Sequence, residues 1–298
     1  MNPFVVKQLQ SINTILARWM EKRAREYPVP DGIEIIRNIP YIQDDNPCHK
    51  MDIFRPAGAP RPLPVVVNLH GGGLVLCTKE VNTQFCCELA KRGFLVFSVD
   101  YPLVPEADIP QMLRDVSAGL DQVHSRLYDY GGDPNRVFLV GDSAGAFLSV
   151  YATAAKNCPA VASSLNLTPT RLPVHAWGLI SGMFYTTSND NVGLFLKKDF
   201  YGKNWRTHPF MAYVHPDRPE IAGNLPPCIL ITSKSDNLRN YTMKFYRGLQ
   251  ACGNRCDLID HPRSAGLQHD FLIVSPEHPA SQETLDRMTE FLLHNHSY

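Results

Sequence analysis

Apolar residues recur along this chain in two alternating patterns. The first is a short, nearly continuous apolar run, as expected of a parallel strand that is covered on both faces. Such runs lie at 65–69, 94–99, 137–140, 174–180, 226–233 and, more briefly, 256–260. The second repeats apolar residues at helical spacing, and it predicts helices over 80–92, 108–127, 144–156, 239–252 and 279–294. This alternation predicts an α/β chain with a mostly parallel, doubly wound sheet.

Four regions depart from this rhythm. Residues 4–26 read as a helix, and 33–54 alternates as antiparallel strands do. For the helix we consider packing on the body, a lid over the cleft, and a membrane surface, the last weakened by its acidic residues. Residues 158–173 show no pattern and predict a loop. Residues 184–225 are rich in aromatic and turn-forming residues without a strand, which favours a lid over ordinary surface elaboration.

The strongest chemical signal surrounds Ser143. A predicted buried strand ends in Gly141-Asp142-Ser143-Ala144-Gly145, and small and apolar residues follow. The pattern G-x-S-x-G alone is weak, but its place between a strand and a helix predicts a sharp turn with the serine at its apex. Glycines on both sides leave room where the strand and the helix come close. The start of the helix directs N–H groups toward the serine.

A glycine-rich turn follows the strand at 65–69. The residues are His70-Gly71-Gly72-Gly73, and three consecutive glycines allow the backbone to approach a ligand closely. The backbone N–H groups of Gly72 and Gly73 are therefore candidates to face the same cleft as the serine. The plain alternative is a flexible turn.

A serine nucleophile needs a base and an acid that orients the base. Asp236 follows a predicted strand and is the candidate acid, although it could also cap the next helix; Asp260 is the runner-up. His269 follows the last predicted strand and is the candidate base. His261 and His278 compete with it for that role.

Four motifs carry a family resemblance when they are taken in chain order. They are His70-Gly71-Gly72-Gly73, Asp100-Tyr101 with Pro105-Glu106, Gly141-Asp142-Ser143-Ala144-Gly145, and Asp236 with Leu238-Arg239 and His269-Asp270-Phe271. With these motifs, nearly the whole chain resembles the hormone-sensitive-lipase-like branch of the α/β-hydrolases. The resemblance implies an eight-stranded, mostly parallel sheet with helices on both faces. It also implies a single domain over 1–298 with a helical cap formed by about 1–40 and 184–220.

The resemblance also implies the roles of individual residues. Ser143 is the expected nucleophile, His269 the general base and Asp236 the acid. The expected oxyanion hole consists of the N–H groups of Gly72, Gly73 and Ala144, and the expected supporting residues are His70, Gly71 and Asp142, with His70 bracing the glycine turn. Family members usually have Arg at the position of Pro102, Gly at that of Ala146, and commonly Gly at that of Asp270. None of these departures removes a reacting group.

Charge and composition exclude other classes of protein. Lys and Arg together number 29, as do Asp and Glu, so the chain lacks the basic excess of a nucleic-acid binder. No apolar stretch is long enough to span a membrane, and the first residues do not read as a secretory signal. We therefore expect a cytoplasmic protein without stable membrane insertion. Eight scattered cysteines without a C-x-x-C pair predict free thiols rather than disulfides.

The sequence predicts a carboxylesterase that cleaves short-chain acyl esters, including acetyl and aryl esters, through an acyl-enzyme. Because no metal-ligand spacing recurs, we expect no metal and no cofactor. The expected partner is a small-molecule ester, and the chain is expected to be a monomer or a homodimer. Two alternatives stay open: an amidase or peptidase that uses the same three residues, and a non-catalytic binding module on the same fold.

Overall fold

The computed structural model describes residues 3–188 and 191–295, with the side chains of 3–6 and 191–195 left aside. Its described part contains one eight-stranded sheet in the order β1-β2-β4-β3-β5-β6-β7-β8. The strands are β1 (Ile33–Pro40), β2 (Lys50–Pro56), β3 (Leu63–Leu69), β4 (Leu95–Val99), β5 (Gly132–Asp142), β6 (Ala176–Ile180), β7 (Cys228–Ser233) and β8 (Cys256–His261).

Strands β4, β3, β5, β6, β7 and β8 lie side by side and run parallel. Strand β2 pairs antiparallel with β4, and β1 pairs antiparallel with β2 at the edge of the sheet. Every residue of β4, β6 and β7 is buried, as the continuous apolar runs require of strands covered on both faces. The predicted α/β-hydrolase sheet is therefore confirmed. Because the strands are parallel, the ends of β3, β5 and β7 meet at one edge of the sheet, where such folds bind ligands.

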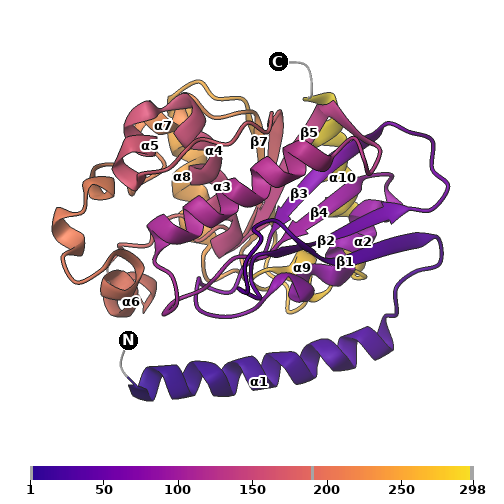
Figure 1. Cartoon of the computed structure of the whole chain (residues 1–298), viewed down its shortest axis with the longest axis horizontal. Coiled ribbons are helices and arrows are strands. Elements are labelled where there is room, and N and C mark those ends of the chain that lie inside the picture. The colour runs from indigo at the N-terminus through magenta and orange to yellow at the C-terminus, as the bar shows by residue number, and fades with distance from the viewer. Residues whose placement is uncertain (1–2, 189–190, 296–298) are drawn as a thin grey trace.

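Helices cover both faces of the sheet (Figure 1). The helices and short 3₁₀ turns are α1 (Pro3–Glu26), η1 (Lys79–Asn82), α2 (Thr83–Lys91), α3 (Ile109–Arg126), α4 (Ala144–Asn157), α5 (Pro159–Leu165), α6 (Asn191–Tyr201), η2 (Trp205–Thr207), η3 (Pro209–Ala212), α7 (Pro219–Ala222), α8 (Arg239–Ala251), α9 (Phe271–Val274) and α10 (Pro279–His294). Apolar residues of α3, α4 and α8 join one buried cluster, and those of α2, α9 and α10 join the cluster on the opposite face.

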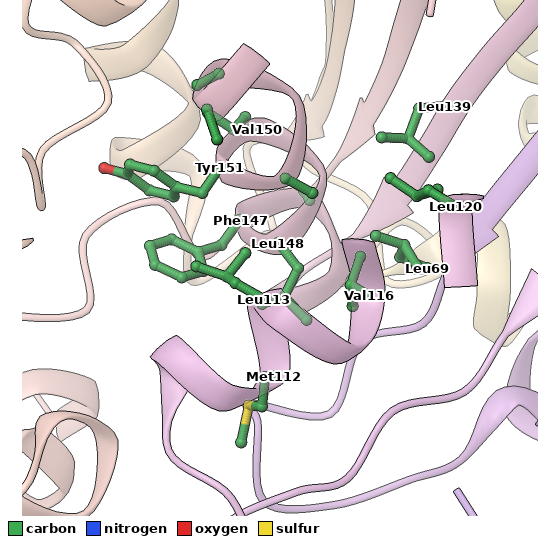
Figure 2. Close-up of a cluster of buried hydrophobic side chains, with 14 of the residues drawn as sticks. Leu69, Met112, Leu113, Val116, Leu120, Leu139, Phe147, Leu148, Val150 and Tyr151 are labelled. Carbon is green, nitrogen blue, oxygen red and sulfur yellow. The ribbon is translucent and has the colours of Figure 1, made fainter. Parts of the chain in front are cut away.

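The helix that follows Ser143 is held firmly in the first of these clusters. Figure 2 shows side chains of α3 and α4 packed together beside Leu69 of β3 and Leu139 of β5. Phe147 and Leu148 of α4 are fully buried there, as is Leu113 of α3. A close-packed interior tolerates little displacement, so this packing fixes the start of α4, and with it the turn at Ser143, against the sheet.

One predicted loop is wrong. The stretch 158–173, which carries no clear pattern, contains the helix α5. Pro159 stands in its first turn, where the missing N–H costs nothing, and Asn166 ends it in the left-handed conformation. The helix is too short to show a helical period, so its proline and asparagine were the available signals. The short helix α9 was likewise not predicted.

The predicted cap segments lie next to each other at the C-terminal edge of the sheet. Helix α1 runs along this side of the molecule, apart from the two helical layers (Figure 1). It is tied to the body through Arg23, whose guanidinium is 2.7 Å from the Glu277 carboxylate. The described part of 184–225 forms α6, η2, η3 and α7 without a strand, as expected. Residues 1–2 and 189–190 of the predicted cap lie outside the described residues, and residues 33–40 form the edge strand β1.

Candidate active site

Ser143 occupies a tight turn between β5 and α4. Its backbone has φ 48° and ψ −112°, a combination that L-residues rarely adopt and that functional sites retain. The two flanking glycines are sterically required. A Cβ on Gly141 would lie 2.6 Å from the backbone of Gly145, and one on Gly145 would lie 2.0 Å from the Leu69 carbonyl oxygen. The turn therefore presents the serine side chain at the carboxyl end of β5.

The structure brings His269 and Asp236 to this serine. The Nε2 atom of His269 is 3.0 Å from the Ser143 hydroxyl oxygen, and its Nδ1 atom is 2.8 Å from Asp236 Oδ1. With an acceptor at Nδ1, the neutral ring carries its proton there and leaves Nε2 free to accept the serine proton. The three predicted residues thus form one continuous line of contacts.

Asp236 is held by donors on both of its oxygens. The hydroxyl of Thr232 donates to Oδ2 at 2.9 Å, and the backbone N–H of Leu238 donates to Oδ1 at 2.8 Å. Burial raises the pKa of Asp236, but the hydrogen bond and charge of His269 outweigh this effect, so the pKa lies below its ordinary value. An ionised Asp236 is therefore available to orient the imidazole and to stabilise its charged form.

A further carboxylate faces the other ring nitrogen of His269. Asp270 Oδ2 lies 3.2 Å from Nε2, on the nitrogen that also contacts Ser143. Burial lowers the pKa of His269, but the charges and hydrogen bonds of Asp270 and Asp236 outweigh it and raise this pKa to about 10. Sequence patterns gave no indication of this contact beyond the departure from glycine at this position.

The glycine turn after β3 is anchored next to Ser143. The backbone N–H of Gly71 donates to Asp142 Oδ2 at 2.9 Å. Gly72 and Gly73 have φ values of 109° and 64°, which favour glycine, and a Cβ on Gly72 would lie 2.1 Å from the Leu76 carbonyl oxygen. Both glycines line the same pocket as Ser143. The role of their N–H groups, and that of Ala144, stays a prediction.

Asp142 links the glycine turn to the interior. Its Oδ1 atom accepts a hydrogen bond from Asn82 at 2.7 Å, and Asn82 also donates to Asn68 on β3 at 3.2 Å. Burial raises the pKa of Asp142 to about 7, and the nearby Asp270 carboxylate adds to the rise. Asn82 thus holds the Asp142 carboxylate in place, although no sequence motif includes it.

His70 is buried behind the glycine turn. Its ring stacks on Tyr101 with centroids 4.3 Å apart. One ring nitrogen is 2.8 Å from the Gly71 carbonyl oxygen, and the other is 2.8 Å from Asp100 Oδ1. Both partners are acceptors, which favours a proton on each ring nitrogen and so the imidazolium form. In agreement, although burial lowers the pKa of His70, the hydrogen bond and charge of Asp100 raise it overall.

A largely apolar pocket of about 680 Å³ contains Ser143 and His269. Helix α1 contributes Ile15, Leu16 and Trp19 to its lining, and α6 contributes Leu196. The remaining apolar lining consists of Val75, Leu76, Val81, Met183, Leu238, Ile273 and Val274. A pocket of this size accommodates a small organic molecule with most of its surface buried.

The competing candidates lie elsewhere. Asp260 forms a two-pronged ion pair with Arg239 at 2.9 and 2.6 Å. His261 contacts the Thr284 hydroxyl at 2.7 Å, and His278 accepts the Ala280 N–H at the start of α10. None of the three contacts Ser143.

Of the residues around Asp236, Thr232 was also missed, because a threonine within a buried strand carries no signal of its own.

No group of three or more His, Cys, Asp or Glu side chains that could hold a metal ion occurs among the described residues. All eight cysteines are free thiols, in agreement with the prediction. Within 3–188 and 191–295, no helix has both the length and the apolar character to cross a membrane. The cytoplasmic location stays a prediction.

The sheet order, the serine turn after β5 and the chain order Ser, Asp, His together define an α/β-hydrolase. The family model described as the alpha/beta hydrolase fold, Abhydrolase_3, matches residues 66–273. The chain belongs to this family, and the predicted hormone-sensitive-lipase-like resemblance is confirmed.

Curated relatives match parts of the chain. A probable isoprenylcysteine alpha-carbonyl methylesterase of Arabidopsis thaliana is 34% identical over 108 residues, which cover 36% of this chain and 23% of that protein. The carboxylic ester hydrolase LipN of Mycobacterium tuberculosis is 28% identical over 234 residues, covering 74% of this chain and 60% of LipN. The chain thus spans about a quarter of the length of the first relative and less than two thirds of the second.

The solved structures include a similar fold over almost the whole chain. Esterase B of Lactobacillus rhamnosis, in a crystal structure with a tributyrin phosphonate inhibitor, has a TM-score of 0.90 and 19% identity. The superposition covers 99% of this chain and 97% of that one. At 19% sequence identity, this structural similarity supports the fold alone.

Proposed function

We propose that the chain is a serine carboxylic ester hydrolase that acts on short-chain acyl esters, including acetyl and aryl esters. The observation that carries the proposal is the unbroken line of contacts from Asp236 through His269 to Ser143 beside an apolar pocket. The three residues follow three different strands of the sheet. The three side chains meet beside an apolar pocket, which supports a shared catalytic role. Polar residues that only stabilise the fold have no need of such a pocket.

Acylation begins when His269 Nε2 takes the Ser143 hydroxyl proton and Oγ forms a bond to the ester carbonyl carbon. The carbonyl π electrons move onto oxygen, and the imidazolium is stabilised by Asp236. The tetrahedral intermediate then collapses, the bond to the alcohol oxygen breaks, and the imidazolium gives its proton to that oxygen. The products of this stage are an acyl-enzyme on Ser143 and a free alcohol.

The negative oxygen of the intermediate needs fixed donors. Gly72, Gly73 and Ala144 supply backbone N–H groups on the two sides of Ser143, and the start of α4 adds its partial positive charge. The bond from Gly71 to Asp142 holds the glycine turn against the serine turn. Because these donors are backbone groups on rigid elements, they need little reorganisation as charge develops.

Deacylation repeats the same proton transfers with water. His269 takes a proton from water, the hydroxide oxygen bonds to the acyl carbon, and the bond to Ser143 Oγ breaks as the proton returns to Oγ. The carboxylic acid then leaves and the resting enzyme is restored. No step needs a metal or an organic cofactor.

The preference for short acyl chains is argued from the pocket. About 680 Å³ must hold both the acyl group and the alcohol, and its walls are aliphatic and aromatic. The inhibitor named in the similar esterase B structure is a tributyrin phosphonate, which also carries short acyl chains. The first curated relative is named for a methyl ester, which again is a carboxylic ester. An amidase would use the same residues on a less reactive carbonyl.

Nitrophenyl esters from acetate to palmitate test this proposal, together with the anilide of the preferred acid. Ser143→Ala should lower kcat/KM for the best ester by at least about 10⁴-fold, because no nucleophile replaces the hydroxyl. Ser149→Ala is a matched control, since Ser149 is a buried serine of α4 whose hydroxyl donates only to the Gly145 carbonyl at 2.8 Å.

Activity should peak at short chains in the parent and in Ser149→Ala and vanish in Ser143→Ala. Hydrolysis by Ser143→Ala at the parental rate would contradict the role of Ser143 as the nucleophile. A higher kcat/KM for the anilide than for the ester would favour an amidase, and no turnover of any ester by the parent would favour the binding module.

A further inference from the structure

Asp270 places a second carboxylate directly after His269 in the chain. Its backbone lies in the left-handed region, with φ 55° and ψ 34°, directly before α9. Aspartate enters this region more readily than most residues, so the turn that glycine would form is retained. The Asp270 N–H donates to the buried Ser181 hydroxyl at 3.2 Å, which fixes the residue in place.

The side chain of Asp270 points at the atom that performs the proton transfer. Its Oδ2 atom is 3.2 Å from His269 Nε2, while the Ser143 hydroxyl is 3.0 Å from the same nitrogen. The other ring nitrogen is already engaged by Asp236 at 2.8 Å. Asp270 Oδ1 is buried and has no hydrogen-bond partner among the described residues. His269 therefore lies between two carboxylates.

This arrangement requires a proton between Nε2 and Asp270. A neutral His269 with its proton on Nδ1 would direct its Nε2 lone pair at the Asp270 carboxylate, which is repulsive. An imidazolium donates to both carboxylates and removes the repulsion. Burial raises the pKa of Asp270, but the charge and hydrogen bond of His269 act against this rise and favour the proton on the ring. In that state Nε2 carries a proton and cannot accept another from Ser143.

We propose that Asp270 competes with Ser143 for Nε2 of His269, so that the resting general base is protonated at neutral pH and ester hydrolysis increases toward alkaline pH. The inference rests on the proposed triad. Asp270 acts here as a group that sets the working pH of the reaction. Loss of the proton frees Nε2 for the serine, and the same carboxylate then stabilises the imidazolium that forms during acylation.

The charged and titratable groups around His269 favour this assignment. Asp236 follows β7, Asp270 precedes α9, and Asp142 ends β5. Cys77 lies in the loop after the glycine turn, and burial, followed by the charges of Asp142 and Asp270, raises the pKa of its thiol to about 12. The pocket residues from α1 and α6 are apolar, and no Lys or Arg lines the described pocket. Lys234 and Arg263 line a separate pocket on the Asp236 side of His269. The two carboxylates in direct contact with the ring favour a proton on His269, in line with its raised pKa of about 10.

The first test is the pH dependence of kcat/KM for nitrophenyl butyrate between pH 5.5 and 10.5, with buffer hydrolysis subtracted. The variants are Asp270→Gly and Asp270→Asn, since both residues accept the left-handed backbone. Asp257→Asn is the control, because this exposed aspartate of β8 does not line the pocket. The parent and the control should share an acid limb with its midpoint above pH 8.

Both Asp270 variants should move that midpoint down by at least about one pH unit, as loss of a close opposite charge requires. Relative to its own plateau, each variant should then be about five- to tenfold more active at pH 7 for a shift of one unit, and more for a larger shift. A midpoint equal to that of the parent in both variants would overturn the inference.

The second test does not need activity. Imidazole nitrogen shifts from NMR of the labelled parent protein, assigned with His269→Gln, report the charge of His269 directly. We expect an imidazolium at pH 7.5 in the parent and a neutral ring in Asp270→Gly. A neutral His269 in the parent at pH 7.5 would overturn the inference even if the variants fold poorly.

The two proposals fail in different ways. If Ser143→Ala hydrolyses esters as fast as the parent, the proposed function fails. If Ser143→Ala is inactive but the Asp270 variants keep the parental midpoint, the triad stands and only the role of Asp270 is wrong.

Discussion

Two histidine–aspartate pairs in this molecule have the same contact distance but opposite surroundings. His70 and His269 each place a ring nitrogen 2.8 Å from an aspartate oxygen. The ring of His70 is completely buried and its second nitrogen faces a carbonyl oxygen. The side chain of His269 is 29% exposed, lines a pocket, and its second nitrogen faces a hydroxyl and a carboxylate.

The difference shows that an aspartate partner does not by itself define a catalytic histidine. A carbonyl oxygen can only accept, so it fixes a proton on His70 and leaves the ring nothing to exchange. A serine hydroxyl can donate its proton, so it gives His269 a reaction to perform. Access to the pocket then decides whether a substrate can use that reaction. By this criterion we expect His70 to brace the glycine turn.

The largest expected effect concerns His269, the more exposed of the two histidines. His269→Ala should lower kcat for a short nitrophenyl ester by about 10⁴-fold or more, because no other described group contacts the serine hydroxyl as a base. Its melting temperature should stay within about 3 °C of the parent, since the truncated ring is partly solvent-exposed. Steady-state kinetics measure kcat, and thermal melts measure the melting temperature.

A variant that retains parental activity would show that His269 is not the base. A large loss of stability would instead make His269 a structural residue like His70, and the contrast between the two would disappear.

The second prediction concerns the aspartate of the exposed pair. Asp236→Asn should lower kcat by about 10³- to 10⁴-fold, because an amide can stabilise the wrong tautomer of His269 and cannot stabilise its charge. The matched control is Asp260→Asn, the rejected candidate acid, which pairs with Arg239 away from the serine. That variant should retain the parental kcat.

Kinetics on both variants over the same ester series decide between the two carboxylates. A large loss in Asp260→Asn with little change in Asp236→Asn would reverse the assignment. Equal small losses in both would show that orientation of His269 does not depend on an acid.

Most of the fold could be predicted from the sequence because buried parallel strands leave continuous apolar runs. The runs at 65–69, 94–99 and 137–140 became β3, β4 and part of β5. The prediction failed at α5, where seven residues are too few for a helical period. Its position follows from packing, since Val161 and Leu165 are buried against the rest of the core. That contact depends on the folded chain and leaves no local pattern.

The residues of the proposed triad could be identified from sequence because each follows a strand and stands in a motif. Their supports could not. Asn82 reaches Asp142 across 60 positions of sequence, and Thr232 is one polar residue inside a buried strand. The approach of Asp270 to Nε2 depends on the left-handed turn before α9, and no sequence pattern specifies where that side chain points.

The smallest expected effect concerns the buried pair of His70 and Asp100. Asp100→Asn should reduce the free energy of unfolding by about 3 kcal/mol, because it leaves a buried imidazolium without its counter-charge. The loss in kcat/KM should stay below about 100-fold, since Asp100 does not contact Ser143 or His269 and acts through the glycine turn. Denaturant unfolding of this variant, the parent and the exposed-site control Asp257→Asn measures the stability difference.

The pH dependence of that difference gives the sharpest contrast with His269. The folded-state pKa of His70 is raised above its ordinary value. The stabilisation is therefore fully present below about pH 6.5 and is lost as the pH rises through the raised folded-state pKa. The stability gap between the parent and Asp100→Asn should be largest at pH 6 and smaller at pH 9. A gap that grows with pH would mean that His70 is neutral in the folded protein, and that a buried ring between two acceptors is not fixed as a cation.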